Sequence, residues 1–132
     1  MLPDDEFLAR FEAGHLPAAE FHHEDHVRAT WLCIEKYGEE RAGAKVAAGI
    51  RAIAAAHGIA ERYHETITTV WVRLIAHHRA LDPTSDFDVF YAHARGLSDQ
   101  KLPERHYSRD VLFSSAARAA FVEPDLRPLP VV

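Results

Sequence analysis

Residues 61–81 read ERYHETITTVWVRLIAHHRAL, and this stretch has the clearest helical pattern in the chain. Its large side chains recur at spacings of three and four residues, which places them on one face of an α-helix. Such a helix would be about 30 Å long, at about 1.5 Å per residue. Asp82-Pro83 follows and is expected to end it, because proline cannot continue a helix. The residues of the repeating face are Tyr63, Ile67, Val70, Trp71, Leu74, Ile75 and His78.

Similar patterns predict helices on both sides of this stretch. Gly14 and Gly38 are typical residues to end a helix, and Ser108 is a typical residue to begin one. No segment alternates apolar and polar residues as a β-strand would, and residues 124–130 form an extended, proline-rich tail. We therefore expect a single all-α domain over residues 1–132, a bundle of five to six helices with short loops. The further helices are expected at residues 4–13, 24–37, 40–57, 86–95 and 108–122.

The composition excludes several classes of protein. Of the 132 residues, 48% are hydrophobic and 27% are charged, which is typical of a globular domain. The formal net charge is −5 and no segment is strongly basic, which argues against a nucleic-acid partner. No apolar run approaches the roughly 20 residues that a membrane span requires. The N-terminus lacks the pattern of a signal peptide, and the single cysteine, Cys33, excludes an intrachain disulfide, so we expect a cytoplasmic protein.

The chain is rich in histidine, with ten in 132 residues. Three of them lie in residues 21–28, FHHEDHVR, at the start of a predicted helix. His23 and His26 are three residues apart and can face one point, but His22 and His26, four apart, can do the same. The choice between His22 and His23 therefore stays open at this point. Because short loops make neighbouring helices antiparallel, the helix start at His64 is expected at the same end of the bundle.

This gathering of histidines predicts a mononuclear metal site. A neutral imidazole is the form that binds metals, and the partial positive charge of a helix N-terminus disfavours the imidazolium. His23, His26 and His64 would hold one divalent ion (zinc, iron or copper) and leave a position open. Glu65 would act as a general base or orient a histidine, although a glutamate in a first helical turn also suits the helix dipole. In the other interpretation, these histidines are hydrogen-bonded structural groups.

A set of motifs extends over about residues 21–130. They are F-x-H-x-x-H-V-R at 21–28, Y-H-E-T-I-T at 63–68, Y-S and L-x-S-x-x-A-R within 107–118, and P-D-L-x-P-L-P at 124–130. In these motifs the chain resembles a family of small, uncharacterised, all-helical bacterial proteins. The resemblance implies that His23 is the ligand rather than His22. It also draws attention to Tyr107, Arg28 and Arg118, and it implies no reaction.

The first functional hypothesis is a small metal-dependent enzyme that acts on a small molecule. It would use Lewis-acid (hydrolytic) chemistry with a metal-bound water, or oxygen chemistry if the metal is iron or copper. Glu65 and Tyr107 would be catalytic, and Arg28, His106 and Arg118 would contact the substrate.

The alternative hypothesis is a non-catalytic module that binds a metal or a small ligand at the same histidine-rich end. A third interpretation is a pH-responsive interaction surface, because imidazole titrates near pH 6.5. Whether the protein is an enzyme and whether it forms a homodimer are questions that the sequence leaves open.

Overall fold

The computed structural model of the protein describes residues 2–17, 19 and 21–130, and these contain helices but no β-strand. Seven α-helices occur in this part of the chain, so the all-helical prediction is confirmed, with more helices than expected. None of the described helices combines the length and the apolar content that crossing a membrane requires. The chain divides into two compact units, Met1–Tyr63 and His64–Val132, and the single domain over residues 1–132 stays a prediction.

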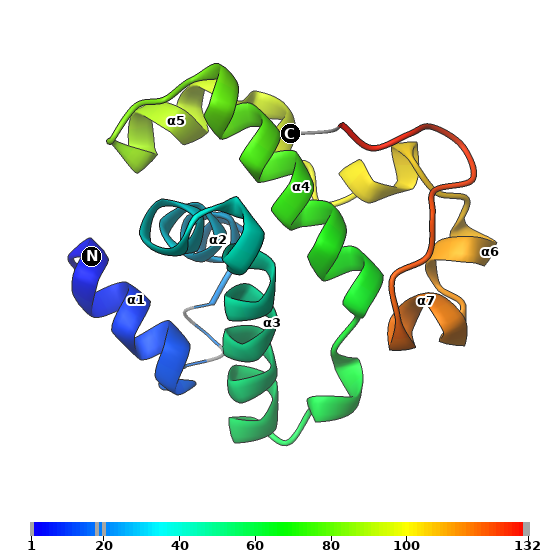
Figure 1. Ribbon diagram of the computed structural model, residues 1–132. Helices are drawn as coiled ribbons and strands as arrows, with labels where there is room; N and C mark the ends of the chain where they lie inside the picture. The colour runs from blue at the N-terminus through cyan, green and yellow to red at the C-terminus, as the bar shows by residue number, and fades with distance from the viewer. Residues whose placement is uncertain (1, 18, 20, 131–132) are drawn as a thin grey trace. The chain divides into compact units, whose positions relative to one another are not determined.

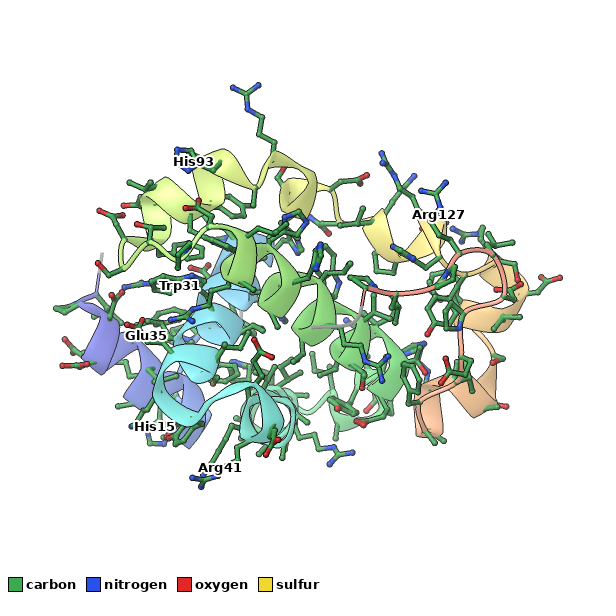
Figure 2. The ribbon with its side chains drawn as sticks, turned by 45° about the horizontal axis from the view of Figure 1, so that its top comes forward. His15, Trp31, Glu35, Arg41, His93 and Arg127 are labelled. Carbon is green, nitrogen blue, oxygen red and sulfur yellow. The ribbon has the colours of Figure 1, made fainter. Side chains whose placement is uncertain are left out.

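The first unit is built from three long helices. In Figure 1, α2 is seen almost along its axis while α1 and α3 run down the page, so α2 crosses the other two. Gly49 of α3 allows a close approach to α1, because the ring of Phe11 occupies the space that a Cβ atom at this glycine would fill. Trp31 is completely buried, whereas Arg41 lies at the outer edge of the unit (Figure 2). The elements are α1 (Asp4–Ala13), α2 (His23–Tyr37), α3 (Glu39–Ala56) and the 3-10 turn η2 (Ala60–Arg62).

The second unit is built around one long helix, α4, against which the short helix α7 packs. After α7 the chain continues as an extended tail, residues 121–130, which runs back past α7 and α6 (Figure 1). Leu129 near the end of this tail is buried, so the tail is part of the packed unit. The elements are α4 (Glu65–Leu81), α5 (Phe87–His93), α6 (Arg109–Leu112) and α7 (Ser115–Ala119), with 3-10 turns η3 (Arg95–Ser98) and η4 (Leu102–Arg105).

The helix predicted over residues 61–81 begins four residues later than expected. His64 has an extended backbone and is the N-cap of α4, and its side chain accepts the backbone N–H of Ile67. A side chain that takes up a free N–H in the first turn stabilises the helix start at that position. The residues before it form the separate turn η2.

The helix predicted over residues 108–122 is divided into α6 and α7. Ser114 separates them, because its hydroxyl donates to the carbonyl of Val111 at 2.7 Å and accepts the N–H of Ala117 at 3.1 Å. A serine that bonds to the backbone in this way competes with the hydrogen bonds of a continuous helix.

Candidate functional site

The histidine-rich stretch at the start of α2 forms a local helix-initiating structure. His22 is the N-cap, and Asp25 Oδ2 accepts its backbone N–H at 2.9 Å and lies 3.5 Å from ring atom Nδ1. Phe21 precedes the cap and stacks on His26 with 3.9 Å between ring centroids. These pairs have the geometry of a capping box and a hydrophobic staple. Two of the three histidines in this stretch, His22 and His26, therefore help to begin the helix.

His26 also has the properties of a metal ligand. Its side chain is partly buried, and burial, together with the nearby charge of His23, lowers its pKa to about 4 although Asp25 acts in the opposite direction. The ring is therefore neutral at pH 7. Among the described residues neither ring nitrogen has a hydrogen-bond partner, and the stacked Phe21 covers a face of the ring rather than its edge. Imidazole binds metals through the lone pairs at its edge, so His26 is available as a ligand.

Arg28, whose predicted contact with a substrate stays a prediction, holds the start of α1. Its guanidinium donates to Asp4 Oδ1 at 2.7 Å and to the carbonyl of Leu2 at 2.8 Å. The same group lies over the ring of Phe7, 4.3 Å from its centroid. Arg28 is buried by these contacts, and they give it a structural role in the first unit.

His57 has a structural role in the same unit. It is the C-cap residue of α3, and its Nε2 lies 3.1 Å from the carbonyl oxygen of Leu16, to which it can donate a hydrogen bond. This contact connects the end of α3 with the loop that follows α1. His57 is therefore held by contacts within the first unit.

His64, the third predicted ligand, uses both of its ring nitrogens inside the second unit. Nδ1 accepts the backbone N–H of Ile67 at 3.1 Å, and Nε2 lies 2.7 Å from the carbonyl oxygen of Leu112. An acceptor at Nδ1 and a donor at Nε2 define one neutral tautomer. Burial lowers the pKa of His64, and the charge of Arg118 lowers it further, although the bond to Leu112 acts in the opposite direction. In this arrangement neither nitrogen offers a lone pair to a metal.

Glu65 is the first residue of α4 and is partly buried. A carboxylate in this position interacts favourably with the helix dipole, which is the structural interpretation of this residue. Its predicted role as a base, with Tyr107 as a second catalytic residue, stays a prediction.

His106 and Tyr107, predicted to contact or act on a substrate, fasten the tail. His106 Nδ1 lies 3.1 and 3.2 Å from the carbonyl oxygens of Arg127 and Pro128, and its own carbonyl accepts the N–H of Arg127 at 3.3 Å. The Tyr107 hydroxyl donates to the carbonyl of Val122 at 2.6 Å. Burial raises the pKa of Tyr107 to about 12, so its phenol is protonated near neutral pH.

Thr66 is an important residue of this unit that no sequence pattern singled out. Its side chain is completely buried, and its hydroxyl donates to the carbonyl of Ala120 at 3.0 Å and accepts the N–H of Val122 at 3.2 Å. It thus connects the first turn of α4 with the start of the tail. The available signal was a threonine inside the Y-H-E-T-I-T motif, in the first turn of a helix whose inner face is mostly apolar.

Arg118, also expected to contact a substrate, lies in the last turn of α7, and its charge acts on His64. Arg109, on α6, donates to Glu104 at 2.7 Å and lies over the ring of Phe113. Both arginines are therefore parts of the second unit.

The predicted metal trio is divided between the two units, with His23 and His26 in the first and His64 in the second. In residues 2–17, 19 and 21–130, no group of three or more His, Cys, Asp or Glu side chains is arranged to hold a metal ion. Comparison of the chain with models of known protein families, with curated proteins and with solved structures gave no match. The family resemblance stays a prediction.

Proposed function

We propose that the protein is a non-catalytic module that binds a divalent transition-metal ion through imidazoles at the start of α2. His26 would be the principal ligand, and His22 or His23 would be the second. The observation that carries the proposal is that, among the described residues, neither ring nitrogen of His26 is hydrogen-bonded.

The neighbourhood of His26 supports this role. Stacking on Phe21 holds the ring in one orientation, which lowers the entropy that binding would cost. Asp25 lies beside Nδ1 of His22, and a carboxylate in this position orients a histidine ligand. Zinc, copper and iron are all compatible with imidazole ligands.

The proposal leaves His64 out of the site. A site of three imidazoles would require His64 to give up its bond with Ile67 or with Leu112, and each would leave a buried polar group without a partner. This cost weighs against the metal-dependent enzyme and favours the binding module.

The experiment is a calorimetric titration of untagged protein with Zn²⁺ and Cu²⁺, together with elemental analysis. His26→Phe keeps the stacking on Phe21 but has no nitrogen, so it should lose binding while the helical circular dichroism is unchanged. His15→Ala removes an exposed histidine from the same unit and should bind as the wild type does. Equal binding by His26→Phe and wild type, or no binding by either, would refute the proposal. Loss of binding in His64→Asn would point back to the three-imidazole site.

A further inference from the structure

The imidazoles at the start of α2 lie at the surface of the first unit. The side chain of His22 is 74% exposed, and that of His26 is partly buried. The backbone N–H of His26 donates to the carbonyl of His22 at 3.1 Å, so the two side chains begin one helical turn apart. Two histidines at this spacing can hold one metal ion between them. An ion held in this way is within reach of a second molecule.

Asp25 influences which nitrogen of His22 is offered to the ion. Its Oδ2 atom accepts the backbone N–H of His22 at 2.9 Å and lies 3.5 Å from ring atom Nδ1. A carboxylate beside Nδ1 favours the tautomer with its hydrogen on that atom, which leaves the lone pair on Nε2. His23, the other candidate for the second ligand, is half-buried and has an interaction of its own. These observations favour His22 as the partner of His26.

Two imidazoles leave the coordination of a metal ion incomplete. In the part of the chain that the structure describes, no group of three or more His, Cys, Asp or Glu side chains is arranged to hold an ion. A structural zinc ion in a protein has four ligands in a tetrahedral arrangement. The same pair of histidines from a second copy of the chain would supply the two that are missing.

The charges of the chain oppose association in the absence of an ion. The formal net charge is −5, and Glu24, next to the histidines, is exposed. Two copies that approach through this face repel each other, because charges of one sign interact over about 8–10 Å at ordinary ionic strength. A divalent cation at the contact offsets part of this repulsion. We therefore expect association to depend on the ion.

We propose that one divalent metal ion joins two copies of this chain, each of which supplies His22 and His26. This inference rests on the metal binding proposed above and adds its partner, a second copy of the same protein. The contact is isologous, since the same turn of α2 takes part on both sides. The site has four imidazole ligands and no open position, as a non-catalytic site requires.

Sedimentation velocity of the untagged protein during stepwise addition of Zn²⁺ tests this proposal. The mass should double and reach its maximum at one Zn²⁺ for every two chains, and a chelator should restore the monomer. A large excess of Zn²⁺ should also return dimers to monomers, because each pair of histidines then has its own ion. Monomers that bind one Zn²⁺ per chain would overturn the dimer and leave the metal-binding module in place. No binding of Zn²⁺ would overturn both.

His22→Asn is the matched variant, because asparagine is a good N-cap and keeps the start of α2. It should stay monomeric at the Zn²⁺ concentration that makes the wild type dimeric, and so should His26→Phe. His15→Ala and His23→Ala should dimerise as the wild type does. A dimer of unchanged stability in His22→Asn would overturn the proposal, and so would equal association of all four variants.

The ¹⁵N spectrum of the histidine rings of the wild type gives a second test, which does not depend on how well a variant folds. Half an equivalent of Zn²⁺ should shift Nε2 of His22 and one ring nitrogen of His26 in all chains. Signals of His22 that do not change while the mass doubles would contradict the proposed contact.

Discussion

Thr66→Val removes a single oxygen atom and keeps the shape of the side chain. In the wild type this hydroxyl donates to the carbonyl of Ala120 at 3.0 Å and accepts the N–H of Val122 at 3.2 Å, and the residue is completely buried. The substitution leaves the carbonyl of the exposed residue Ala120 and the N–H of the half-buried Val122 without their partner. A fully buried group of this kind costs about 1–3 kcal/mol, and here the cost is reduced by partial access to water and by the transfer of a methyl group out of water. We expect the second unit to lose about 1–3 kcal/mol of stability.

Urea unfolding, followed by circular dichroism and by exchange of the Val122 amide, measures this loss. Thr66→Ser keeps the hydroxyl and should cost only about 1 kcal/mol, the value of one methyl group. Thr84→Val removes an exposed hydroxyl that accepts one N–H, from Asp86, and should cost less than about 1 kcal/mol. Equal stability of Thr66→Val and wild type would show that the reasoning about this attachment point is mistaken.

Three further predictions concern the first unit. Gly49→Ala should destabilise it by about 1–3 kcal/mol, because the new Cβ overlaps the ring of Phe11. Gly43→Ala, whose Cβ would meet nothing within 4 Å, should stabilise α3 by about 0.5–1 kcal/mol. Thermal melts that rank the two variants the other way would contradict this prediction. Arg28→Met should lower the free energy of unfolding by about 1–2 kcal/mol, a value reduced because the side chain of its partner Asp4 is 51% exposed. Arg10→Met, which removes an exposed ion pair, should have almost no effect in the same urea unfolding experiment. The unfolded pKa of His26 is near 6.5 and the folded value is about 4, so its contribution to stability is complete above pH 6.5 and decreases by about 2–3 kcal/mol as the pH falls toward 4. His26→Phe should remove this part of the acid sensitivity, and an unchanged pH profile of urea unfolding would argue against it.

The helices could be predicted from the sequence because their signals are local. Apolar residues at spacings of three and four residues mark the inner face of α4, and glycines mark the ends of α1 and α2. The start of α2 is also local, since its cap and its aromatic stack join residues three and five apart. The start of α4 and the division of the helix predicted over residues 108–122 were not foreseen, because each depends on which polar side chain bonds to the backbone.

The roles of the buried polar residues were decided by tertiary structure. His64 bonds to a carbonyl 48 residues away, His106 to one 21 residues away and Thr66 to one 54 residues away. Backbone carbonyls are present at every position, so no residue pattern shows which one a histidine will meet. The sequence by itself therefore determined an all-helical chain with an extended tail and many histidines. Only the tertiary structure decided what those histidines contact, because their partners are brought close by packing between distant segments of one unit.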